Sequence, residues 1–96
     1  MAYYFSAQIR INDPDEYDRY LENFDEIFSR YRGEYLAIDE APTILEGDWN
    51  YTKTVLIRFR NREEFESWYF SKDYQEILKY RLKAAKCDTI LIKGND

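Results

Sequence analysis

Residues 68–75 read Trp-Tyr-Phe-Ser-Lys-Asp-Tyr-Gln, so four aromatic side chains gather around one serine. Ser71 is a residue type that begins helices, because its hydroxyl can accept one of the backbone N–H groups left free in the first turn. Apolar residues at helical spacing lie before it at Phe65, Trp68 and Tyr69, and after it at Tyr74, Ile77, Leu78 and Leu82. This pattern predicts a short helix, a bend at Phe70-Ser71 and a longer helix that ends near Ala85.

A predicted strand lies on either side of this bent helix. Thr52 to Arg60 alternates, with Val55, Ile57 and Phe59 on one face and Thr54, Leu56 and Arg58 on the other. Asn61, followed three residues later by Glu64, is typical of a helix start. Cys87 to Lys93 is apolar and is predicted to be the last strand. The C-terminal half therefore reads strand, bent helix, strand.

The N-terminal half begins with a strand and a helix as well. Tyr3 to Ile11 alternates and predicts a strand with one apolar face. Asp13 and Pro14 then open a helix whose apolar stripe is formed by Tyr17, Tyr20, Leu21, Phe24, Ile27, Phe28 and Tyr31. Gly33 is predicted to end this helix as the residue beyond its C-cap.

The segment between the two halves predicts a hairpin. Glu34 to Ile38 is the second predicted strand, and Ala41-Pro42 interrupts it. Thr43 to Glu46 resumes extended structure before a turn at residues 47–50. Because the connection to the strand at 52–60 is short, we expect the two strands to pair antiparallel.

The predicted order of elements is β-α-β-β-α-β, which is typical of an α+β, ferredoxin-like plait. Such a fold has an antiparallel four-stranded sheet with its helices on one face, and we expect residues 1–96 to form one such domain. Tyr4 and Leu56 make the second face of the sheet apolar too, although no helix is left to cover it. We therefore expect a homodimer through the sheet faces.

Composition narrows the classes of partner. The formal charge of −5 and pI of about 4.8 argue against nucleic-acid binding, which depends on Lys and Arg. No run of apolar residues is long enough to span a membrane, and the N-terminus lacks the basic region of a signal peptide. Cys87 is the one cysteine, so no internal disulfide can form, which favours the cytoplasm. Aromatic residues make up 19% of the chain, which is more than a small core needs.

Charge is distributed unevenly along the chain. Residues 1–48 carry 4 basic and 12 acidic side chains, and residues 49–96 carry 10 basic and 7 acidic ones. Solvated faces of opposite sign explain this asymmetry most simply. It is also consistent with head-to-tail contacts between copies or with attraction of an anionic ligand to the basic last third.

An ordered set of short motifs resembles the family called domain of unknown function 1330. The set comprises Leu45-Glu46-Gly47-Asp48-Trp49, Val55-Leu56-Ile57-Arg58-Phe59, Trp68-Tyr69, Ser71, Tyr74-Gln75, Arg81 and Ile92-Lys93-Gly94. The resemblance implies a dimeric α+β barrel, in which two plaits pack their sheets together. It also implies a pocket between the sheet and the helices, because relatives in that superfamily include cofactor-free monooxygenases and isomerases with such a pocket.

The chain departs from the family pattern at several positions. Ile38-Asp39-Glu40 stands where family members tend to have Arg-Gly-Gly, and Lys72 stands where they tend to have proline. If that family arginine binds an anion, this protein binds something else or uses Arg58 or Arg81 instead.

No catalytic motif is present in the sequence. The absence of histidine removes the commonest general base and the commonest metal ligand, and we expect neither a metal site nor a cofactor. The catalytic residues, if the protein is an enzyme, stay unknown. Our candidates for a ligand pocket are the aromatic and cationic residues Trp49, Arg58, Trp68, Tyr69, Tyr74 and Arg81. In the structural alternative Trp68 and Tyr74 belong to the core and Arg81 pairs with a carboxylate.

Three functions are compatible with these residues. The first is a cytoplasmic homodimer that holds a small aromatic or anionic metabolite between sheet and helices. The second is a cofactor-independent monooxygenase or isomerase of the dimeric α+β barrel type. The third is a structural or regulatory partner that binds no small ligand. The sequence leaves open whether the protein is an enzyme.

Overall fold

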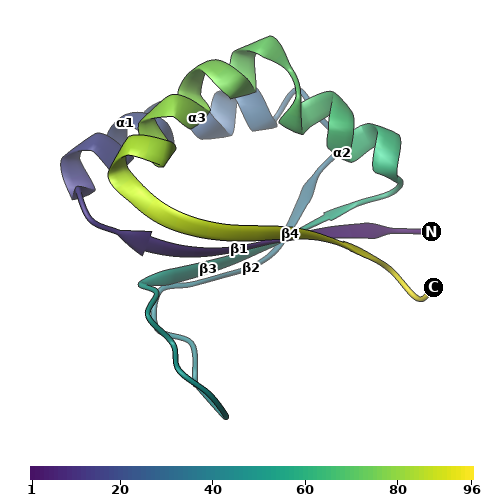
Figure 1. Cartoon of the computed structure of the whole chain (residues 1–96). Helices are drawn as coiled ribbons and strands as arrows, with labels where there is room; N and C mark the ends of the chain where they lie inside the picture. Colours follow the sequence, from purple (N-terminus) through teal and green to yellow (C-terminus); the bar gives the residue numbers. More distant parts are fainter.

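Three helices cover one face of a four-stranded antiparallel sheet in the computed structural model, which describes residues 1–96 (Figure 1). The elements, in chain order, are β1 (Tyr3–Ile11), α1 (Pro14–Phe28), β2 (Glu34–Asp39), β3 (Lys53–Phe59), α2 (Arg62–Tyr69), α3 (Lys72–Ala84) and β4 (Ala85–Lys93). The strands lie in the order β2-β3-β1-β4, and every pair is antiparallel. This arrangement confirms the predicted ferredoxin-like plait. None of the three helices has the length and apolar content of a membrane span.

Side-chain caps begin all three helices where the sequence predicts them. The carboxylate of Asp13 accepts the backbone N–H of Glu16 at 3.2 Å, and the Asn61 amide oxygen accepts that of Glu64 at 2.9 Å. Ser71 accepts the N–H of Tyr74 at 3.2 Å and donates its hydroxyl to the Trp68 carbonyl at 2.7 Å. Ser71 therefore joins the end of α2 to the start of α3, and the predicted bend is confirmed.

Two local predictions were wrong. The first helix ends at Phe28 with Ser29 as its cap, before the position that a glycine stop at Gly33 implied. Gly33 is required instead by close packing, since a Cβ there would lie 2.4 Å from the Phe28 ring. Thr43 to Glu46 forms no strand, because no neighbouring strand offers this segment hydrogen bonds. β1 has the predicted boundaries, and those of the other strands differ from prediction by at most two residues.

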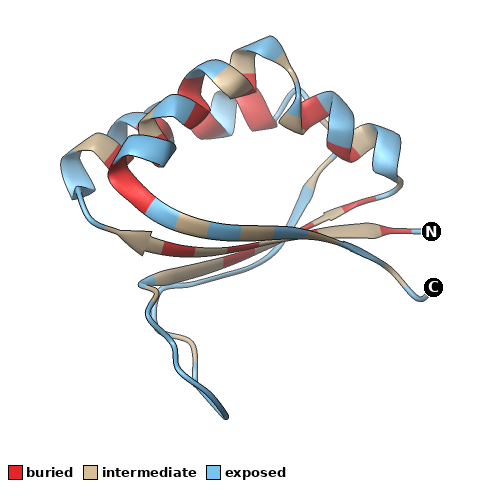
Figure 2. Cartoon of the chain, in the orientation of Figure 1, coloured by how far each residue is buried: buried red, intermediate tan, exposed pale blue.

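The core lies between the helices and the inner face of the sheet. Alternate residues of β1 and β3 are buried in it, and Figure 2 shows buried residues recurring along the strands and along the helices above them. Trp68 is at its centre with none of its surface exposed. The aromatic rings within 6.3 Å of the Trp68 ring are those of Phe5, Phe24, Phe28, Phe59, Phe65, Tyr69 and Tyr74. Much of the aromatic excess therefore belongs to the core.

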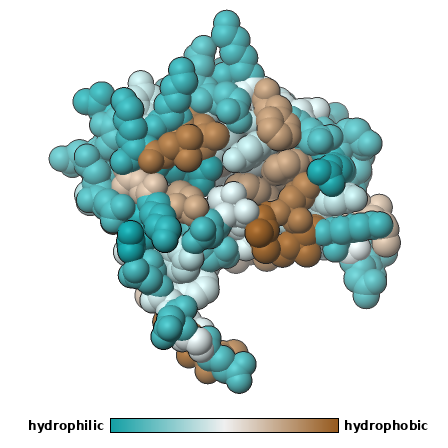
Figure 3. All heavy atoms as spheres, in the orientation of Figure 1, coloured by the Kyte–Doolittle hydropathy of each residue, from teal (hydrophilic) through white to brown (hydrophobic).

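The opposite side of the sheet, which we call the open face, has no helix over it. Tyr4 lies on it between Arg58 and Ile92, and Ser6 lies between Leu56 and Ile90. Ile90 is 57% exposed, and apolar atoms reach the surface near β4 in Figure 3. The second apolar face predicted from the sequence is therefore present.

Residues 40–52, which we call the arm, connect β2 to β3. The arm extends away from the body of the molecule on the side of the open face (Figure 1). Gly47 forms part of its turn with a φ of 88°, a left-handed conformation that favours glycine. The arm is the one long irregular segment of the fold.

Candidate functional site

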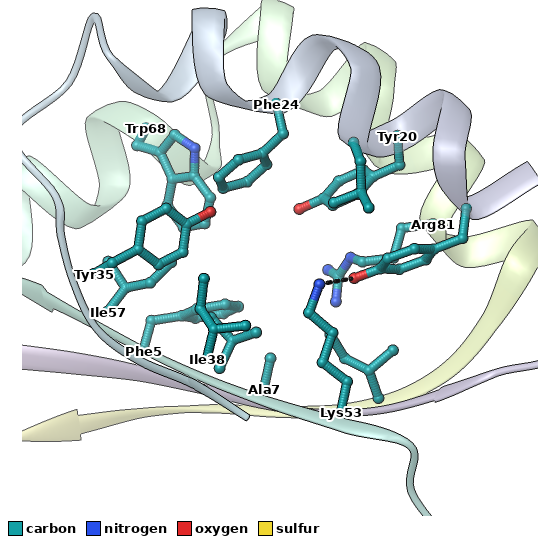
Figure 4. A pocket seen from close by; sticks show the side chains of 14 residues that line it. Phe5, Ala7, Tyr20, Phe24, Tyr35, Ile38, Lys53, Ile57, Trp68 and Arg81 are labelled. Atoms are coloured by element: carbon teal, nitrogen blue, oxygen red, sulfur yellow. Dashed lines mark hydrogen bonds between the residues drawn. The ribbon is translucent and has the colours of Figure 1, made fainter. Parts of the chain in front are cut away.

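A cavity of about 40 Å³ lies between α1, α3 and the inner face of the sheet (Figure 4). Twelve of its 14 lining residues are hydrophobic, and they include Phe24 and Trp68. The two charged side chains that line it are Lys53 from β3 and Arg81 from α3. The cavity therefore has an aromatic end and a cationic end.

Arg81 is the only charged side chain in the core, with 2% of its surface exposed. No carboxylate forms an ion pair with it, and its Nε is buried without a hydrogen-bond partner. The guanidinium lies 5.8 Å from the centre of the Tyr20 ring, a cation–π contact. The structural alternative is therefore wrong for Arg81, which pairs with no carboxylate, but it is confirmed for Trp68 and Tyr74, which belong to the core. Arginine stays protonated in proteins even when buried, so Arg81 brings an uncompensated positive charge into the core.

Three tyrosines surround this charge without neutralising it. The hydroxyls of Tyr20 and Tyr74 share a hydrogen bond of 2.9 Å, and Lys53 Nζ donates to the Tyr17 hydroxyl at 3.4 Å. Burial raises the pKa of all three phenols above 10. Burial also raises the pKa of the Cys87 thiol, which lies near Arg81. At neutral pH these groups are uncharged, so they can donate or share protons but cannot balance the guanidinium.

Lys53 supplies a second cation at the same end of the cavity. Its side chain is half-buried, and burial lowers the pKa of its amine, while Glu40 opposes this effect. Its Nζ also lies 5.1 Å from the centre of the Tyr17 ring. In Figure 4 the Lys53 and Arg81 side chains approach one another, while Tyr35 and Trp68 lie at the far end.

The predicted site residues fall into two groups. Trp68 and Arg81 line the cavity, and Tyr74 lies directly behind it through its bond to Tyr20. Tyr69 stacks on Phe65 at 5.3 Å but does not line the cavity.

Two other candidates lie elsewhere in the fold. Arg58 lies opposite Tyr4 on the open face of the sheet, because neighbouring residues of a strand point to opposite faces and Ile57 points into the core. Trp49 lies in the arm against Tyr51, with a ring separation of 5.0 Å. Neither belongs with Arg81, so these two candidates do not form part of the same site.

Among the polar and charged lining residues, sequence reasoning missed four, namely Tyr17, Tyr20, Tyr35 and Lys53. Lys53 shares the inward parity of Val55 and Ile57, and a lysine on the buried side of a strand is a signal that the sequence contains. Tyr17 and Tyr20 were assigned to the apolar stripe of the first helix, where their hydroxyls have no sequence signature.

The buried tyrosines predict a loss of stability in alkali. Burial raises the pKa of Tyr17 to about 12 and also raises the pKa of Tyr20, Tyr35 and Tyr74. Below pH 10 the phenols are neutral in both states, so their contribution to stability is fully present. Above it the unfolded chain releases protons first, and we expect the free energy of unfolding to fall as the pH rises from 10 to 12.

Denaturant unfolding at several pH values, with phenolate absorbance recorded in parallel, measures this effect. Tyr17→Phe should make the alkaline decline shallower, because it removes one of the linked groups. Ionisation of all ten tyrosines near pH 10 in a chain that stays folded would contradict the prediction.

Comparison with known families identifies a sequence relationship. A family model described as "Domain of unknown function (DUF1330)" matches residues 2–95, which confirms the resemblance seen in the motifs. No curated protein matches this chain in sequence.

Solved structures share the fold at low sequence identity. A protein of unknown function from Rhodopseudomonas palustris superimposes with a TM-score of 0.80 over 99% of this chain and 83% of its own, at 16% identity. A dimeric ferredoxin-like protein of unknown function from Jannaschia sp. CCS1 superimposes with a TM-score of 0.74 over 98% of this chain and 100% of its own, at 10% identity. SnoaB, a cofactor-independent oxygenase from Streptomyces nogalater, superimposes with a TM-score of 0.69 over 99% of this chain and 94% of its own, also at 10% identity. These likenesses show the fold alone.

Proposed function

Because this chain belongs to the DUF1330 family, whose description leaves the function open, we propose a function from its own site: it binds a small organic anion at Arg81. The observation that supports this proposal is the buried guanidinium that no group of the chain neutralises. Removing an ion from water costs several kcal/mol even after the protein relaxes. A desolvated cation–π contact returns about 2 kcal/mol of that cost. An anionic ligand would offset the rest.

The cavity also favours a particular shape of ligand. Its cationic end, with Arg81, Lys53 and the Tyr17 hydroxyl, suits a carboxylate or another delocalised oxyanion. Its aromatic end, with Phe24 and Trp68, suits an apolar or planar body. A small aromatic or otherwise apolar carboxylate combines both features.

The ligand must displace part of the cavity wall to enter. A volume of about 40 Å³ holds little more than one water molecule, whose share of liquid volume is about 30 Å³. Leu21, Tyr35 and Ile38 line the cavity and are also exposed at the surface. Tyr35 and Ile38 lie on β2, an edge strand whose residues are all exposed. We infer that ligand entry moves these side chains outward.

Thermal unfolding with paired ligands tests this function. Benzoate and cyclohexanecarboxylate should raise the melting temperature in a concentration-dependent way, whereas benzamide, which lacks the charge, should raise it much less. Equal stabilisation by benzamide and benzoate would contradict a site built around a cation.

A second candidate is cofactor-independent enzyme chemistry, which Lys53 favours. Burial lowers the pKa of its amine, and the amine lies at the same end of the cavity as Arg81. When it has lost its own proton, the amine can take a proton from a carbon of the ligand, which leaves the electron pair of that bond on an oxygen held by Arg81. An isomerase would return the proton to a different carbon. A cofactor-independent oxygenase, as SnoaB is described, would add O₂ to that carbon as a hydroperoxide, which loses water and leaves one oxygen atom as a carbonyl. Deuterium uptake from solvent into a bound carbonyl compound, lost in Lys53→Met, would identify this activity.

We also propose that the chain forms a homodimer through its open face. An uncovered apolar surface with Tyr4, Leu56, Ile90 and Ile92 is unusual for a monomer, and the Jannaschia neighbour is described as dimeric. The single cysteine, with no internal disulfide, is consistent with a cytoplasmic dimer. Light scattering should give twice the chain mass of 11.8 kDa at micromolar concentration, and a mass of one chain would refute the dimer.

A further inference from the structure

We propose that the arm, residues 40–52, is a clasp that grips the basic end of the second copy. By the basic end we mean residues 79–86, where α3 ends and β4 begins. This inference rests on the proposed dimer, and it adds which surfaces meet outside the open faces. It is independent of the ligand cavity.

The direction and length of the arm place it beside a second copy. It projects on the side of the open face, where the partner's sheet would lie (Figure 1). Each limb has about six residues and can span roughly 20 Å when extended. Packed sheets lie about 10 Å apart. The tip therefore reaches past the partner's sheet to the level of its helices.

The tip of the arm has an apolar surface that its own chain leaves uncovered. Leu45 is 88% exposed, and Ile44 and Trp49 are exposed as well. Together with Pro42, Thr43 and Glu46 they line an open hollow of about 330 Å³. Exposed apolar side chains at the end of a projecting segment are typical of a contact made with another chain.

The base of the arm is continuous with the open face. The Tyr51 hydroxyl donates to the Asp88 carboxylate of β4, and the Tyr51 ring packs edge-on against Trp49. Ala41 N–H donates to the Asp39 carboxylate at 2.9 Å, which holds the other limb where it leaves β2. Both limbs are therefore held before a partner arrives, which lowers the entropy lost on association.

Charge identifies the partner surface. The arm has three acidic residues, Glu40, Glu46 and Asp48, and no basic one. The basic end presents three exposed lysines, Lys79, Lys83 and Lys86, and has no acidic residue, while the side chain of Arg81 lies in the core. This pairing gives a structural meaning to the opposite net charges of the two halves of the sequence.

Two-fold symmetry allows two ways for the arm to meet the partner, and charge selects one of them. If the axis runs along the strands, the arm meets the end of the partner at which β4 begins, because β1 pairs antiparallel with β3 and β4. If the axis runs across the strands, the arm meets the opposite end, where Glu34 and Glu63 lie. The acidic arm favours the first arrangement. Each dimer then contains two identical clasps.

Charge reversal on both sides tests this pairing. Sedimentation equilibrium over a range of concentrations would compare the wild type with E46K/D48K, with K83E/K86E and with the combined variant. Each reversal alone should raise the dimer dissociation constant at least about tenfold, since exposed ion pairs contribute up to about 1 kcal/mol each and occur twice per dimer. The combined variant should return to within about threefold of wild type. E63K/E66K, on the surface of α2, is the matched control and should change nothing.

The outcomes separate the clasp from the dimer itself. A monomeric wild type overturns both proposals. A dimeric wild type whose dissociation constant is unchanged by either reversal, or is not recovered in the combined variant, overturns the clasp alone. Replacing residues 41–50 by Asn-Gly gives an independent result: an unchanged circular dichroism spectrum with a weaker dimer supports the clasp, and an equally tight dimer overturns it.

Discussion

Trp68→Ala is expected to lower the free energy of unfolding by about 4 kcal/mol. The indole has no exposed surface and contacts aromatic rings from β1, β3 and all three helices. Its nearest neighbour is Tyr74 at 4.4 Å between centroids, and it stacks on Phe59 at 5.5 Å with an interplanar angle of 23°. Removing it leaves a cavity that these rigid rings cannot fill. A domain of this size has about 5 to 14 kcal/mol of stability in total, so the variant should be close to unfolding.

Denaturant unfolding followed by circular dichroism measures this loss. Phe70→Ala is the matched control, because Phe70 is the neighbouring aromatic in the same stretch but is 65% exposed, and its loss should cost less than about 0.5 kcal/mol. Trp68→Phe should cost less than Trp68→Ala, since it keeps a ring and removes an indole N–H that has no partner. Equal costs for Trp68→Ala and Phe70→Ala would show that the stretch does not organise the core.

Arg81→Met is expected to abolish anion binding and to stabilise the empty protein. Truncating one partner of a buried charge pair costs 2 to 5 kcal/mol of affinity, so the dissociation constant for benzoate should rise at least about 30-fold. In the empty protein the same change removes a desolvated charge and one cation–π contact. Burying the charge costs more free energy than the cation–π contact contributes, so the free energy of unfolding should rise by about 1 to 3 kcal/mol.

Arg62→Met is the control for this variant. Arg62 lies on α2, mostly exposed, where it pairs with Glu66 at 3.6 Å, and its loss should change neither affinity nor stability by much. Calorimetric titration of both variants with benzoate measures the affinities. Binding retained in Arg81→Met would place the anion elsewhere.

The sequence predicted the fold well because local signals agreed with one another. Caps at Asp13, Asn61 and Ser71 mark the three helix starts, and each makes its expected hydrogen bond. Period-two alternation in β1 and β3 identified the buried face correctly. These features depend on residues close in the chain, so no tertiary information was needed.

The site was less predictable because it depends on the absence of any carboxylate near Arg81 in the folded chain. A sequence shows that Arg81 exists, but not that every carboxylate lies too far away to pair with it. Arg58 and Trp49 were as plausible by residue type, and only strand parity and the course of the arm separate them from Arg81. Thr43 to Glu46 in the arm was predicted to resume extended structure, and the absence of a partner strand for it is a tertiary fact.

The most direct test of Arg81 as an unpaired cation held for a ligand is the free energy of unfolding of Arg81→Met beside wild type, without any added anion. We predict that the variant is at least as stable as wild type, because burying the charge costs more free energy than its cation–π contact with Tyr20 contributes. A loss of about 3 kcal/mol or more, the cost of breaking a buried ion pair, would show that Arg81 has a structural partner and would contradict the account.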